Sequence, residues 1–193
     1  TFSLRLSGFY LSTTGASNWG HIIDVTGAGS GWRIDNNFLH HTYNQNSVGK
    51  AIVSVNANVP YWTLFGLIDN NTFKNVYIYL GGGNGSAEHG WKQTAQWGTA
   101  NALFIENNHF DFSDSSIIGV AVDNQNGGRA TIRYNVFDDM YLMIHSACQT
   151  SVRGGRSYEV YNNLFRATLA SSASSPYFII FRAGSGLVSQ NHV

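Results

Sequence analysis

The chain has 193 residues, of which only 11% are charged, and its formal net charge is zero. Average soluble proteins carry roughly 25% charged residues, and proteins that bind nucleic acid normally have a basic face, so this composition argues against a nucleic-acid partner. No apolar run reaches the ~18 residues that a membrane helix needs, so we expect no membrane span. The single cysteine, Cys148, excludes an internal disulfide framework.

One motif recurs along the chain. Each copy has an aliphatic residue, an Asn three positions later and an apolar residue five positions later. The spacings between consecutive copies are 34, 37, 27, 28 and 28 residues. A period of this length is typical of repeat proteins whose units stack on one another. The copies begin at Ile34, Ile68, Ile105, Ile132, Val160 and Val188.

A second apolar segment rich in β-forming residues follows each of the first five copies of the motif. Apolar and polar residues alternate within these segments, and an alternation of period two predicts strands. The stretch His21–Thr26 is expected to be a strand of one additional coil within Thr1–Gly31. The sequence thus predicts an almost entirely β chain, with no helix longer than about two turns. The five segments are Ala51–Ala57, Val76–Leu80, Ile117–Asp123, Tyr141–Ser146 and Tyr177–Arg182.

The motif Asn has a structural explanation in a stack of coils. Coils that stack as parallel strands lie ~4.8 Å apart, so equivalent side chains meet along the axis. An Asn at a turn tolerates the left-handed conformation, and its amide can donate to and accept from the Asn of the next coil. The Phe two positions later is expected to stack in the core. The predicted ladder consists of Asn37, Asn71, Asn108, Asn135, Asn163 and Asn191.

With this motif, the chain resembles the right-handed parallel β-helix proteins of the pectate-lyase-like superfamily. The resemblance covers residues from about 32 to 193. It implies a right-handed parallel β-helix, and with the repeat count it predicts a single all-β domain over residues 1–193 with about six to seven coils, expected to be part of a longer solenoid. It does not imply an activity. The calcium and arginine motifs of true pectate lyases are not matched, nor are the paired aspartates of polygalacturonases, so no catalytic residue is carried over.

A candidate site follows from the alignment of the second strands. If Val122 and Ile144 occupy equivalent core positions, the next residues, Asp123 and His145, point outward from adjacent coils. Arginines in the following loops would lie at the same edge. A carboxylate, a histidine and arginines suit binding of an acidic sugar and proton transfer, whereas the alternative is a surface salt-bridge network. We assign catalytic roles to His145, Asp123 and Arg153, and substrate binding to Arg129 and Arg156.

The longest insertion between motif copies lies in Gly81–Ala100. Long loops on a rigid solenoid often carry binding surfaces. Trp91 and Trp97 in this loop are expected to stack on sugar rings. The alternative is that both side chains pack the loop onto the wall of the solenoid.

A second outward column contains three carboxylates, those of Asp35, Asp69 and Glu106. Carboxylates ~5 Å apart repel by about 0.8 kcal/mol per adjacent pair in water. The column therefore calls for neutralisation by Arg133 or for a bound cation such as Ca²⁺, unless the side chains spread apart into solvent.

Our leading functional hypothesis is an exported or surface protein that binds an acidic polysaccharide along one lateral face. If it cleaves that glycan, we expect lyase or hydrolase chemistry, with His145 or an arginine as proton acceptor. The rival hypothesis is a structural or adhesive β-helix, such as part of a phage tailspike, a virion or a filament. The last motif copy ends at Val193 without a visible cap, which suggests assembly through uncapped ends or a homo-oligomer.

Overall fold

The computed structural model describes residues 4–14, 21–26, 29–42, 51–56, 65–81, 91, 94, 96–112, 118–146, 154–167 and 177–193, with only the backbone described for 51–56. Every element whose bounds are defined in these ranges is a β-strand, which confirms the all-β prediction. In the same ranges there is no helix of the length and apolarity needed to cross a membrane.

The strands form three parallel sheets, which we name A, B and C. Sheet A consists of β1 (Arg5–Ser7), β4 (Ser30–Asp35), β7 (Phe65–Asp69), β10 (Leu103–Glu106), β13 (Arg129–Arg133), β16 (Ser157–Tyr161) and β19 (Ser185–Ser189). Sheet B consists of β2 (Tyr10–Thr13), β5 (Phe38–His41), β8 (Thr72–Lys74), β11 (His109–Asp111), β14 (Val136–Asp138) and β17 (Leu164–Arg166). Sheet C consists of β3 (Ile23–Thr26), β6 (Ala51–Asn56), β9 (Tyr77–Gly81), β12 (Gly119–Asn124), β15 (Met140–Ile144) and β18 (Ile179–Phe181).

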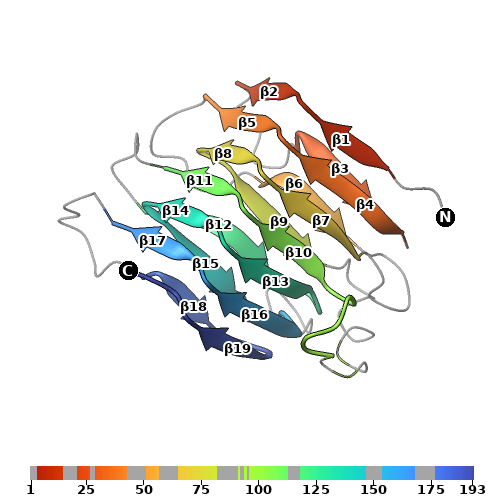
Figure 1. Cartoon of the computed structure of the whole chain (residues 1–193), viewed down its shortest axis with the longest axis vertical. Coiled ribbons are helices and arrows are strands. Elements are labelled where there is room, and N and C mark those ends of the chain that lie inside the picture. The colour runs from red at the N-terminus through yellow and green to blue at the C-terminus, as the bar shows by residue number, and fades with distance from the viewer. Residues whose placement is uncertain are drawn as a thin grey trace.

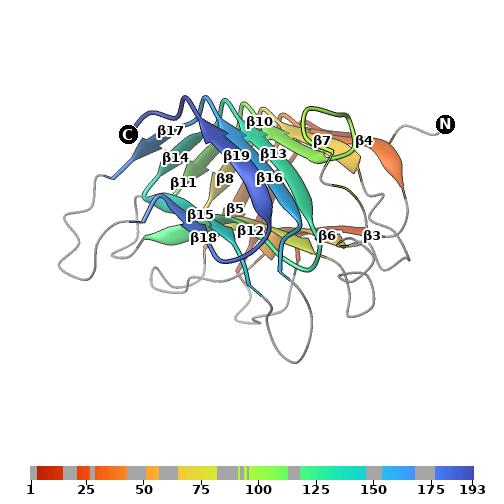
Figure 2. The same cartoon turned by 90° about the horizontal axis from the view of Figure 1, so that it is seen from below.

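Each strand pairs with the strand three elements further along the chain. The chain therefore passes through sheets A, B and C in turn and then returns to sheet A beside the strand it left. Figure 1 shows the resulting stacks of strands, and Figure 2, seen from below, shows the sheets as separate walls around the interior. This arrangement is consistent with a parallel β-helix.

The register of sheet A aligns the motif copies with one another. Ile34 pairs with Ile68, Ile68 with Ile105, and Ile105 with Ile132. These side chains are buried in a continuous hydrophobic core. The N-terminal strands β1, β2 and β3 extend the three sheets by one strand each, as the pattern in residues 1–31 predicts.

The Asn ladder is confirmed between sheets A and B. The first five ladder asparagines each donate the side-chain amide to the Oδ1 of the next ladder Asn along the chain, at 2.9–3.1 Å. The backbone N–H of each donates to the same oxygen, as Asn108 does to Asn135 Oδ1 at 2.9 Å. A buried polar side chain is tolerated when its hydrogen-bonding groups are satisfied, and this ladder meets that condition by repetition.

The left-handed residue of the turn is not the ladder Asn, which corrects the sequence-based explanation. Positive φ values of 53–58° belong to the residue before it, as at Asn36, Asn70 and Tyr134. Asn is favoured there because its short side chain tolerates this conformation. The motif thus has two positions with two purposes: the first, which is Asn in four of the six copies, makes the turn, and the second, which is always Asn, builds the ladder.

The predicted aromatic stack lies in the core beside the ladder. Phe73, Phe110, Phe137 and Phe165 stack in consecutive coils with ring centroids 4.7–5.0 Å apart. All four side chains are at most 1% exposed. Offset stacks of this spacing add to the free energy gained from burial alone.

Candidate functional site

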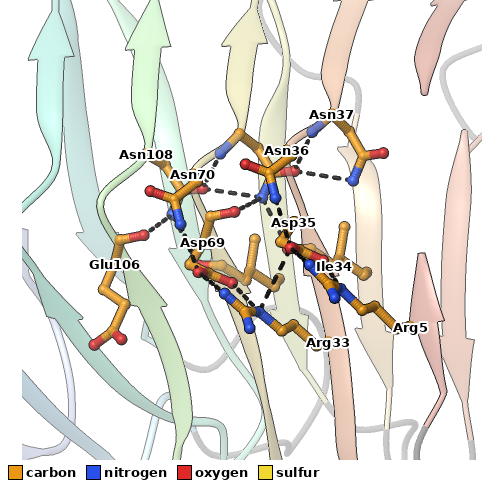
Figure 3. Close-up of polar contacts among 12 residues, drawn as sticks. Arg5, Arg33, Ile34, Asp35, Asn36, Asn37, Asp69, Asn70, Glu106 and Asn108 are labelled. Carbon is orange, nitrogen blue, oxygen red and sulfur yellow. Dashed lines mark hydrogen bonds and ion pairs between the residues drawn. The ribbon is translucent and has the colours of Figure 1, made fainter. Parts of the chain in front are cut away.

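The acidic column of sheet A is neutralised by arginines. Arg5 donates two hydrogen bonds to the Asp35 carboxylate, at 2.8 and 2.5 Å. Arg33 binds the Asp69 carboxylate in the same paired geometry, at 2.8 and 2.6 Å. In each case the arginine belongs to the coil that precedes the carboxylate (Figure 3). Planar guanidinium groups match carboxylates in this two-bond arrangement.

The third carboxylate of the column meets the arginine that the sequence suggested. Arg133 Nε donates to Glu106 Oε2 at 2.5 Å. The residues following the aspartates add further bonds, with Asn36 donating to Asp35 and Asn70 to Asp69. Within the described part of the chain, no group of three metal-ligating side chains gathers. The geometry therefore favours arginine pairing over the Ca²⁺ site suggested for Asp35, Asp69 and Glu106.

Low pH is expected to weaken the ion pair between Arg5 and Asp35. Hydrogen bonds from Arg5 hold the pKa of this carboxyl below its ordinary value, and the charges of Arg5 and Arg33 add to the effect while burial opposes it. A lowered pKa in the folded state contributes stability above the pKa of the unfolded chain, roughly 3.9, and this contribution is lost as the pH falls through the folded pKa. We expect the difference in free energy of unfolding between wild type and Asp35→Asn to shrink below about pH 4.

Urea unfolding from pH 7 to pH 3 measures this difference. Asp24→Asn is the control, because Asp24 is exposed in β3. A wild-type advantage over Asp35→Asn that stays constant down to pH 3 would contradict the prediction.

The Asp123 and His145 side chains meet on the outer face of sheet C, as predicted. His145 Nδ1 lies 3.1 Å from Asp123 Oδ1. Gln125 Nε2 donates to the other oxygen, Asp123 Oδ2, at 2.5 Å and lies 3.0 Å from His145 Nδ1. A charge-assisted bond to a carboxylate is stronger than a neutral one, so the favoured tautomer carries its proton on Nδ1. Asp123 then orients the ring, and Nε2 is its basic nitrogen.

The register that brings these two residues together differs from the predicted one. Val122 pairs with Leu142 and not with Ile144, and Asp123 pairs with Met143. The position aligned with Ile144 is taken by Asn124, which is fully buried. Because Asn124 is polar, the alternation of apolar residues places the last inward position of the strand at Val122, two residues too early. Asp123 and His145 therefore meet diagonally, two positions out of register, while Gln125 completes the cluster.

Two further residues lie near this cluster: Tyr141, which the sequence did not assign to it, and Arg182, which the alignment of the second strands places in the same outward column as Asp123 and His145. Tyr141 is outward-facing on β15, and its pKa is raised by burial first and then by the negative charge of Asp123, while Arg182 opposes the shift. Arg182 is exposed beyond the end of β18, and its backbone N–H donates to Ile144 O. The charges of Asp123 and Arg182 thus both act on the Tyr141 hydroxyl.

Arg129 is fully buried, which corrects its placement in a solvent-facing cluster. It begins β13, and its exposed fraction is 0%. Burial lowers the pKa of its guanidinium to about 10, and the charge of Arg156 contributes to this shift. The guanidinium remains protonated at neutral pH, but a polymer at the surface cannot reach it. Arg153, the third predicted arginine, lies outside the described residues.

Trp91 packs against the segment at Gly154, which fits the alternative to an exposed sugar-stacking role. Its indole N–H donates to Gly154 O at 2.8 Å. Its ring lies 5.3 Å from the Arg156 guanidinium carbon, and Arg156 also donates to Ser185 Oγ at 3.2 Å. Trp97 remains 43% exposed. Of the predicted substrate-binding residues, Trp91 and Arg156 are therefore engaged with each other.

Comparisons of the chain with protein-family models, with curated proteins and with solved structures find no match.

Proposed function

We propose that the chain is a right-handed parallel β-helix of the pectate-lyase-like kind that binds an acidic polysaccharide on the outer face of sheet C. The location that goes with this function is outside the cell, or on a cell or virion surface. The observation that carries the proposal is the contact between Asp123, Gln125 and His145 on an outward face. A rigid wall of parallel strands offers a polymer an extended surface.

The chemistry of the cluster supports an acidic glycan as the ligand. Arg182 is exposed at this edge and supplies a guanidinium for a uronic carboxylate. The Tyr141 hydroxyl can bond to sugar hydroxyls nearby, whereas Asp123 is only 8% exposed and serves to hold the His145 ring. The His145 ring, held in place by Asp123, adds a nitrogen that can form a hydrogen bond with a sugar hydroxyl.

If the protein also cleaves the glycan, the Nε2 nitrogen of His145 is the base in this tautomer. Nε2 would take the proton from C5 of a uronic acid, the C5–H electron pair would form the C4–C5 double bond, and the C4–O4 bond would break, with the leaving oxygen taking a proton from water. This is an elimination with general-base catalysis. Binding is the function we propose, and turnover is a separate question, answered by the ultraviolet absorbance of an unsaturated product.

Binding of oligouronides by calorimetry tests the proposal. We expect His145→Ala and Arg182→Ala each to weaken binding about tenfold, the loss expected for one charge-assisted contact. Added salt should weaken binding to the wild type. Arg166→Ala is the matched control, because Arg166 is an exposed arginine on sheet B, where it binds Asp138. Oligouronide binding that the sheet C variants leave at the level of Arg166→Ala would exclude this site.

The second candidate function is that of a structural or adhesive β-helix. An exposed aromatic side chain away from the first and last strands favours it: Tyr134, at the turn between β13 and β14, is 49% exposed and its ring lies 6.3 Å from that of Tyr161. Exposed aromatic side chains are common at contacts with another chain. Sedimentation analysis distinguishes the two functions: self-association without any glycan binding would favour the structural one.

A further inference from the structure

A separate hollow lies on the outer face of sheet A. Its volume is about 320 Å³, within the range of sites that hold small molecules. It is distinct from the Asp123 cluster, which faces outward from sheet C. The hollow is lined by the segment 98–100 and by Phe104, Thr131, Arg133, Glu159 and Tyr161.

The sequence creates this hollow by placing a short side chain between two longer ones. Phe104, Thr131 and Glu159 are aligned in adjacent strands of sheet A. The threonine in the middle leaves space that its neighbours do not fill. The segment 98–100 lies at the edge of this space and is held there, because Gly98 N–H donates to Glu159 Oε1 at 2.9 Å.

Glu159 presents a buried carboxylate to the hollow. The residue is only 9% exposed, and its Oε1 accepts bonds from Gly98 and, at 3.5 Å, from the Thr131 hydroxyl. Among the residues that the structure describes, no hydrogen bond or cation reaches Oε2. A carboxylate that has lost most of its water and has an oxygen without a donor is a strong acceptor for a ligand.

Arg133 supplies hydrogen-bond donors at the other end. Its Nε binds Glu106 and its NH1 donates to the Tyr161 hydroxyl at 2.9 Å. A guanidinium has five N–H donors, so donors remain beyond these two bonds. The Arg133 guanidinium also lies over the Phe104 ring, 5.2 Å from its centroid. The contacts with Phe104 and Tyr161 together fix the position of the guanidinium.

The charges of the hollow decide which ligand it accepts. The negative charge of Glu106 cancels the positive charge of Arg133. The Glu159 carboxylate therefore leaves the hollow with one net negative charge. An anionic sugar would be repelled, whereas hydroxyl groups can donate to Glu159 and accept from Arg133. We propose that this hollow binds one neutral sugar residue, with the side chains of Phe104 and Tyr161 as its apolar wall.

Saturation-transfer NMR with the methyl glycosides of glucose, galactose and mannose tests the proposal on the whole chain. We expect at least one of them to bind with a Kd on the order of millimolar, a weak affinity in line with so small a contact. Thr131→Met fills the hollow and should abolish the signal. Glu159→Gln keeps the shape but removes the charge, and should weaken binding about fivefold. Thr72→Met, on the outer face of sheet B, is the control and should bind like the wild type.

Three results would overturn the proposal: no neutral glycoside binds, Thr131→Met binds as well as Thr72→Met, or only glucosamine or a uronate binds. Melting curves identify a variant that fails to fold, and Glu159→Gln then decides the question in place of Thr131→Met. This inference does not rest on the acidic-glycan function. Thr131→Met is expected to keep oligouronide binding, and His145→Ala is expected to keep neutral-sugar binding, so either proposal can fail alone.

Discussion

Replacement of Phe110 by alanine is expected to lower the free energy of unfolding by about 4 kcal/mol, in the range measured for large aromatic residues removed from cores. The Phe110 side chain is fully buried. Its ring stacks on Phe73 at 4.7 Å and on Phe137 at 5.0 Å. The substitution leaves a cavity in the middle of a stack and removes two aromatic contacts at once, and chemical denaturation measures the loss.

Phe110→Leu provides the matched control for this prediction. Leu39 occupies the equivalent position two coils earlier, where it pairs with Phe73. The stack therefore already accommodates a leucine, and we expect this variant to lose only about 1.5 kcal/mol. A loss below about 1 kcal/mol for Phe110→Ala would show that the aromatic stack is not a central part of the core.

Replacement of Asn135 by alanine is expected to cost about 3 kcal/mol, because several buried groups lose their partners and each such loss costs about 1–3 kcal/mol. The Asn135 side-chain amide donates to Ile105 O, Arg133 O and Asn163 Oδ1. Its Oδ1 accepts from both the backbone and the side chain of Asn108. Alanine removes all five bonds, and urea unfolding at neutral pH gives the change in stability.

Two companion variants show whether the ladder itself is responsible. Asn135→Asp keeps the shape and the acceptor but removes the donors, so we expect it to be at least as destabilising as alanine. Asn101→Ala removes an exposed asparagine and should change stability by less than about 0.5 kcal/mol. A stable Asn135→Asp protein would show that donation along the ladder does not matter.

The sequence predicts the interior well because the interior repeats. A side chain that must stack on its own copy in the next coil appears at the same position in every copy, so counting reveals it. Asn108 and Asn135 are predicted to touch, and they do. The left-handed turn residue is predicted at the ladder Asn but lies one position earlier, because a single invariant Asn suggests one residue for both roles, whereas Tyr134 and Gln190 show that other residues also adopt the turn conformation.

The outer surface is predicted less well because it depends on exceptions to the repeat. Asn124 occupies an inward position where its neighbours carry Leu80 and Ile144. Alternation therefore misplaced Asp123 by two residues, although its contact with His145 was predicted. Arg129 stands at an outward position yet is fully buried, and no local pattern in the sequence distinguishes a covered outer face from an open one.

The hollow on sheet A shows the same limit. Gly98 precedes β10, but it hydrogen-bonds to Glu159 on β16, two strands further along the sheet. The repeat aligns Phe104, Thr131 and Glu159, but it does not indicate that the segment 98–100 borders the space above them. Contacts between a loop and later coils are set by tertiary packing, which motif spacing does not encode.

A crystal structure of the chain soaked with an oligouronide tests the central functional claim most directly. Our account predicts an ordered uronic acid residue against sheet C, with its carboxylate on Arg182 and a sugar oxygen within hydrogen-bonding distance of His145 or Tyr141. An oligouronide bound on another face, or none bound beside Asp123 and His145 when that face is open in the lattice, would contradict it.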